Sequence, residues 1–135
     1  MHPVPINWLA FAAAVAARVV IGMIWYSPLL FGRAFSALTG RSSQEIQAGL
    51  PLSIASDIIG AAVMAFILAH AVYYAGAQTW LYGAVVGLFN WLGFVVVTQV
   101  ALVMYEKRPM RLFLINVAQW GLVLAVMGAI FAGWR

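Results

Sequence analysis

The sequence is short of two things, charged side chains and cysteine. No cysteine occurs among its 135 residues, and there are only three acidic residues and two histidines. The missing thiols exclude disulfide bonds, cysteine-ligated zinc, iron–sulfur clusters and thiol catalysis. With so few carboxylates and imidazoles, there is no nucleophile–base set and no histidine cluster. We therefore expect neither an enzyme nor a metal or cofactor site.

Apolar residues take the place of the missing charge. Hydrophobic side chains make up 66% of the chain and charged ones 7%, against roughly 45–50% and about 25% in soluble globular domains. A soluble fold of this size buries only part of its surface, so it cannot hide this much apolar area. The composition therefore predicts an integral membrane protein.

Long apolar stretches divide the chain into four parts, at about residues 6–31, 52–75, 79–105 and 110–134. Each is near or above the roughly 20 residues that a helix needs to cross a bilayer, and none alternates as a membrane strand does. We predict one domain over residues 1–135, an all-α bundle of four transmembrane helices. The first connection, 32–51, is polar, and a short interfacial helix is expected in it from Ser43 to Gly49.

Basic residues gather at the ends of the predicted spans and give the chain a net charge of +4. In a four-span protein the first and third connections share one side, and they hold Arg33, Arg41, Lys107, Arg108 and Arg111. The other side holds Arg135 and the amino terminus. The positive-inside rule then predicts a single orientation with both termini outside the cytoplasm. Anionic lipid headgroups at the cytoplasmic face, not nucleic acid, are the expected partner of this charge.

Arg18 is the most unusual residue because it lies near the middle of the first apolar stretch. A charge at the bilayer centre costs on the order of 2.5–3.5 kcal/mol on insertion scales, so it needs a partner or a purpose. Asp57, near the cytoplasmic end of the second stretch, is the natural ion-pair partner because an Arg side chain reaches far towards the interface. Ser56 lies beside it. Both a structural ion pair and an anion or polar-solute site fit this pattern.

Amide side chains mark the third and fourth stretches. Asn90 and Gln99 point in roughly opposite directions on an undistorted helix. Asn116 and Gln119 share a face of the fourth stretch with Trp120. Amides inside a bilayer usually hydrogen-bond across helices. They are therefore candidates either for lining a polar site or for joining two copies of the chain.

Glycine spacing predicts close helix contacts. Gly83 and Gly87 form a Gly-x-x-x-Gly pattern, and Gly121 and Gly128 recur one heptad apart. Such patterns let helix backbones approach, either within one chain or between copies. Polar and small residues also occur on more than one face of the last two stretches. Because polar groups facing lipid are costly, we expect a homo-oligomer that covers them.

The segment 22–35 carries a distinctive block, Trp25-Tyr26-Ser27-Pro28, followed by Leu-Leu-Phe-Gly. This block resembles the signature of a bacterial membrane family known only as domain of unknown function 1761. Later segments agree with that family: Asn-Trp-Leu-Gly-Phe at 90–94, Arg-Pro-Met-Arg-Leu-Phe-Leu-Ile-Asn at 108–116 and Met-Gly-Ala-Ile at 127–130. The resemblance covers nearly the whole chain. It implies a four-helix protein of the bacterial inner membrane and no known activity.

The same block has a physical interpretation. Pro28 lacks an N–H and frees the carbonyl of Ile24, which can kink or end the helix. The Ser27 hydroxyl can bond a nearby carbonyl, and Gly32 permits a left-handed stop. The block is either a helix terminus at the interface or a kinked, water-accessible mouth beside Asp57.

Two functions compete on this evidence. The first is a small-solute binding or transport module with Arg18 and Asp57 at its centre. Its candidate linings are Ser56, Asn90, Asn116 and Gln119. The second is a structural or accessory membrane subunit without transport or catalysis of its own. In that case the ion pair is a folding clamp, and Gly83 with Gly87 forms a docking face.

Overall fold

The computed structural model describes residues 4–40 and 43–134, and every regular element within them is a helix. Four helical segments are long and apolar enough to cross a membrane: Trp8–Trp25 (α1), Leu50–Tyr74 (α4), Trp80–Glu106 and Met110–Gly133 (α7). The third of these consists of α5 (Trp80–Asn90), η1 (Trp91–Val96) and α6 (Val97–Glu106) end to end. The predicted all-α fold with four membrane-spanning helices is confirmed.

The connection after α1 differs from the prediction. α1 ends at Trp25 instead of near residue 31, because the chain turns through the Ser-Pro dipeptide and then forms an unpredicted helix, α2 (Gly32–Thr39). Gly40, with φ at 72°, ends α2 in the left-handed conformation. The predicted short helix is confirmed as α3 (Ser43–Ala48).

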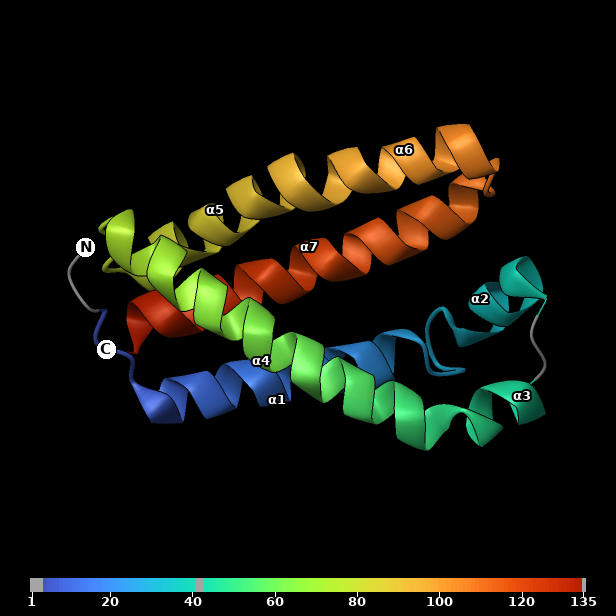
Figure 1. Cartoon of the computed structure of the whole chain (residues 1–135), viewed down its shortest axis with the longest axis horizontal. Coiled ribbons are helices and arrows are strands. Elements are labelled where there is room, and N and C mark those ends of the chain that lie inside the picture. Colours follow the sequence, from blue (N-terminus) through green and yellow to red (C-terminus); the bar gives the residue numbers. More distant parts are fainter. Residues whose placement is uncertain (1–3, 41–42, 135) are drawn as a thin grey trace.

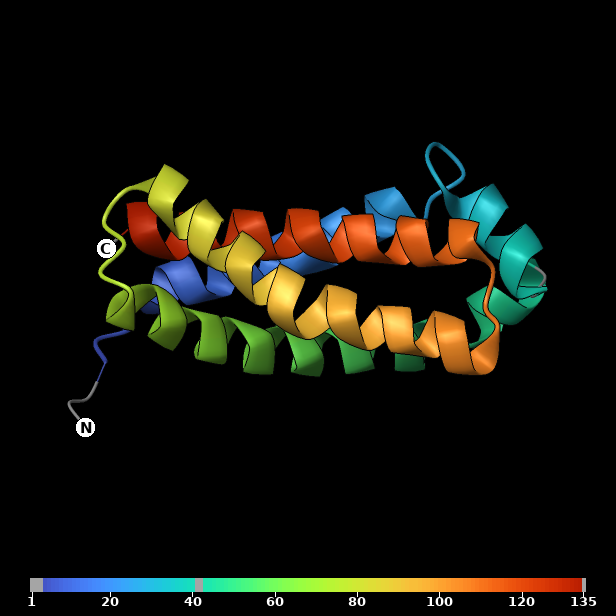
Figure 2. The same cartoon turned by 90° about the horizontal axis from the view of Figure 1, so that it is seen from above.

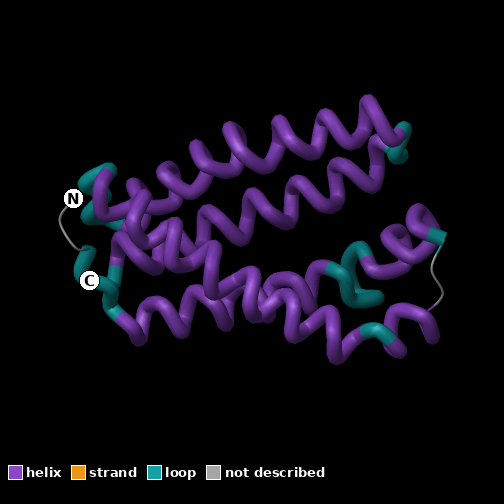
Figure 3. Tube along the Cα trace, in the orientation of Figure 1, coloured by secondary structure: helices purple, strands orange, loops and turns teal. Residues whose placement is uncertain are grey.

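α7 is the central helix of the bundle. It contacts α1, α4 and α5. In its apolar stretch, 44% of the residues are buried inside the protein, against 11% in the span that contains α5 and α6. In Figure 1, α5 and α6 run along one side of α7 while α4 crosses α1 on the other. The described chain begins and ends at the same end of the bundle, opposite α2 and α3 (Figure 2). Towards the α2–α3 end, the α6–α7 hairpin diverges from α1 and α4 (Figure 3).

Glycines allow the tight packing of α5 on α7. A Cβ added to Gly83 would meet the carbonyl oxygen of Gly128, and one added to Gly87 would meet that of Leu124. A Cβ on Gly121 would touch the Trp91 ring, at 3.0 Å. The predicted close contacts are therefore confirmed, and they lie within one chain. Since α7 covers Gly83 and Gly87, the prediction that they form a docking face for another protein is wrong.

A π-helical segment, η1, interrupts the third span. Its first residue, Trp91, donates its indole N–H to the carbonyl oxygen of Val117 on α7 at 2.8 Å. π segments shift the register of the helix that follows them. The prediction that Asn90 and Gln99 point in roughly opposite directions assumes a regular helix, whereas η1 lies between these two residues. Both of them are half-buried.

Candidate functional site

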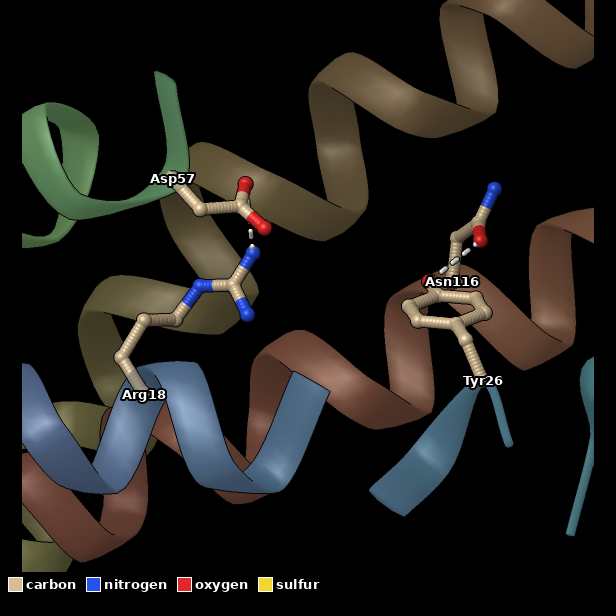
Figure 4. Close-up of polar contacts among 4 residues, drawn as sticks. All are labelled: Arg18, Tyr26, Asp57 and Asn116. Carbon is tan, nitrogen blue, oxygen red and sulfur yellow. Dashed lines mark hydrogen bonds and ion pairs between the residues drawn. The ribbon is translucent and has the colours of Figure 1, made fainter. Parts of the chain in front are cut away.

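The Arg18 side chain crosses from α1 towards Asp57 on α4 (Figure 4). Its Nη2 lies 3.4 Å from Asp57 Oδ1, so the ion pair predicted from the sequence is present. The pair is asymmetric, because the Arg18 side chain is 6% exposed and that of Asp57 is 50% exposed. The contact is also long for a charge-assisted hydrogen bond, which is about 2.7–2.9 Å. Asp57 therefore binds only one nitrogen of the guanidinium, and weakly. The rest of the guanidinium contacts other groups.

The guanidinium is enclosed by α1 and α7. Its Cζ lies 4.3 Å from the centre of the Trp120 ring, a cation–π contact. A Cβ on Gly22, one turn along α1, would lie 2.5 Å from Arg18 Nη1 and 3.8 Å from Gln119 Nε2. The missing side chain at Gly22 thus leaves room for the guanidinium to lie against its own helix, with the Gln119 amide close by.

Arg18 and Gln119, which we call the polar centre, have unused hydrogen-bonding atoms. Gln119 is fully buried on α7 and Arg18 is 5% exposed. Within the described ranges, Arg18 Nη1 and both amide atoms of Gln119 are buried without a hydrogen-bond partner. Leaving a buried donor or acceptor unpaired costs roughly 1–3 kcal/mol, and more for a charged group. The polar centre can therefore supply both donors and an acceptor to a partner.

Two further contacts tie the end of α1 to α7. The Tyr26 hydroxyl donates to Asn116 Oδ1 at 2.7 Å (Figure 4). The Trp25 indole N–H donates to the carbonyl oxygen of Ile115 at 3.1 Å. Asn116, a predicted site residue, is therefore engaged by Tyr26, and these two bonds fix the end of α1 against the amino-terminal half of α7.

The distinctive block at the end of α1 and the helices that it joins lie inside one family match. Residues 9–132 match the model of a family described as protein of unknown function, DUF1761. This chain belongs to the DUF1761 family. No curated protein and no solved structure matches it. Membership of DUF1761 assigns no activity, so function must be argued from the residues themselves.

The signature block of this DUF1761 protein is a compact turn. The Ile24 carbonyl, which Pro28 leaves without its helical N–H, accepts from the Ser27 hydroxyl at 2.6 Å and from the Ser27 N–H at 3.2 Å. Gly32 is not the left-handed stop that we predicted, since it is the first residue of α2 and its φ is not positive. Its N–H donates to the Ser27 carbonyl at 2.9 Å, and a Cβ there would strike the Tyr26 and Ser27 backbone.

Two of the predicted lining residues lie away from the polar centre of this DUF1761 chain. Ser56 is exposed on the surface of α4. Asn90 is half-buried, donates to the carbonyl of Val86 at 2.9 Å and lines an apolar groove between α4 and α5. The sequence indicates only that Trp120 shares a helix face with Asn116 and Gln119. Its cation–π role was missed because the pattern does not show which helix faces meet.

Proposed function

We propose that this DUF1761 protein is a small-solute binding or transport module of the membrane, with Arg18 and Gln119 as its centre. The observation that carries the proposal is a set of three buried polar atoms that have no partner in the described part of the chain, Arg18 Nη1 and the two Gln119 amide atoms. A bound solute that hydrogen-bonds to them would remove the cost of leaving them unpaired. Ionisable residues at such depth usually serve a pathway or a partner.

Asp57 supports a route to this centre. Its side chain is half exposed, although it belongs to the membrane-spanning helix α4. A carboxylate facing hydrocarbon is expensive, so water or another protein surface would reach it. In this proposal Asp57 positions the guanidinium from the exposed side of the ion pair, and the solute passes Asp57 on the way to Gln119.

The structural or accessory role remains the second candidate, favoured by the fact that the Arg18–Asp57 pair joins α1 to α4. A double variant separates the two functions. Arg18→Leu alone should destabilise the protein, by less than the 3–5 kcal/mol of a fully buried pair because Asp57 is half exposed. Arg18→Leu with Asp57→Leu should recover stability.

The decisive measurement is complementation of a deletion phenotype by the folded double variant. A solute module predicts that it fails, although its thermal unfolding midpoint equals that of the wild type. Full complementation would identify the ion pair as a clamp and would reject the solute module.

We further propose the orientation expected from charge: a bacterial inner membrane with both termini outside the cytoplasm. The concentration of Lys and Arg in the first and third connections supports it. Those connections would lie against anionic headgroups. A reporter that is active in the cytoplasm when fused to the carboxyl terminus would refute this orientation.

Homo-oligomerisation is proposed on the polar residues at the surface of the spans. Ser56 and Asp57 are exposed on α4, where lipid would otherwise cover them. Native mass spectrometry that finds only monomers at high protein concentration would argue against a second copy.

We also propose that the chain is not an enzyme, since its few acids and histidines support no acid–base chemistry. Hydrolytic or conjugating turnover by the purified protein would overturn that proposal.

A further inference from the structure

The hydrogen-bond groups around the polar centre show an excess of donors, and this excess indicates the chemistry of the missing partner. The nearby indole N–H groups of Trp25 and Trp91 are both used on backbone carbonyls of α7. Among the described residues, three buried atoms remain unpaired: the nitrogens Arg18 Nη1 and Gln119 Nε2, and the oxygen Gln119 Oε1. A matching ligand therefore accepts more hydrogen bonds than it donates.

The two unpaired nitrogens lie in the same neighbourhood, beside Gly22. Both lie within 4 Å of the point where a Cβ on Gly22 would stand, Arg18 Nη1 at 2.5 Å and Gln119 Nε2 at 3.8 Å. The guanidinium is buried, while the carboxylate of Asp57 is half exposed and contacts the other nitrogen, Nη2. The unpaired side of Arg18 is therefore positive and dry, which favours an anion.

Resting on the proposed function, we infer that the solute is a small carboxylate with a neighbouring hydroxyl. The carboxylate oxygens accept from Arg18 Nη1 and Gln119 Nε2, and the hydroxyl donates to Gln119 Oε1. Guanidinium and carboxylate form strong charge-assisted hydrogen bonds, and an amide side chain both donates and accepts. The solute is small because Gly22 and the Trp120 ring enclose the guanidinium.

The test measures the thermal unfolding midpoint of the purified full chain in detergent, at constant ionic strength, against increasing concentrations of four probes. Glycolate is expected to stabilise the protein, and acetate to need roughly tenfold higher concentration because it lacks the hydroxyl. Glycerol and tetramethylammonium should have no effect. Equal potency of acetate and glycolate would overturn the hydroxyl assignment. Stabilisation by glycerol alone would overturn the carboxylate class while the solute module survives. If no solute of any class acts, both proposals fail.

Single substitutions test whether glycolate binds at the polar centre. Gln119→Glu places a carboxylate of the same size beside Arg18, so the variant should fold and lose its response to glycolate. Gly22→Ala should weaken the response because the new methyl displaces Arg18 Nη1. Gly60→Ala is the matched control, since nothing lies within 4 Å of its added Cβ, and it should respond as the wild type does. An unchanged glycolate response in Gln119→Glu would show that the anion binds elsewhere.

Discussion

The contact between α5 and α7 can be tested with a single methyl group. Gly87→Ala would place a Cβ against the backbone carbonyl of Leu124, where no side chain can rotate away. Gly60→Ala adds the same methyl in the interior of α4 with nothing within 4 Å. Both changes gain the same helix preference of Ala over Gly, about 0.5–1 kcal/mol. The difference in the free energy of unfolding between the two variants therefore isolates the contribution of packing between α5 and α7.

Overpacking a tight contact costs about 1–3 kcal/mol. We expect Gly87→Ala to be less stable than Gly60→Ala by that amount, or about 5- to 150-fold in the folding equilibrium constant. Unfolding can be followed by tryptophan fluorescence during a titration with dodecyl sulfate in mixed micelles. Trp91 is a suitable reporter because its indole bonds to Val117 on α7. Equal stability of the two variants would refute the close approach of α5 to α7.

Two further predictions concern the signature turn. Tyr26→Phe removes the hydroxyl that donates to Asn116 and leaves the amide oxygen unpaired, so we expect a loss of about 1–3 kcal/mol. Tyr105→Phe, at a residue that is 89% exposed, should change stability little in the same dodecyl sulfate titration. Gly32→Ala should prevent the turn from closing on Ser27 and lower the yield of folded protein, which gel filtration in detergent can measure. Yields equal to the wild type would contradict the observed backbone contact.

Hydropathy and charge alone determined that this is a membrane protein with four spans, and that Asp57 is the ion-pair partner of the buried Arg18. These features follow from local composition, because a stretch of apolar residues is inserted in lipid whatever it later contacts. Arg18 and Asp57 could be paired from their depth along two helices, since no other acid lies within reach at that level. The family was likewise indicated by a contiguous block, Trp25 to Pro28, and did not depend on tertiary contacts.

Only the tertiary structure decided which helix faces meet. Lipid is as apolar as the protein interior, so the hydrophobic pattern of a span does not mark its buried side. This is why the sequence left open whether Gly83 and Gly87 face α7 or another chain, and why it grouped Asn90 with Gln119. The end of α1 also depended on tertiary contacts, because Gly32 is required by the backbone of Ser27 folding back on it. The unpaired atoms of Gln119 became evident only once α1 and α7 had been brought together around Arg18.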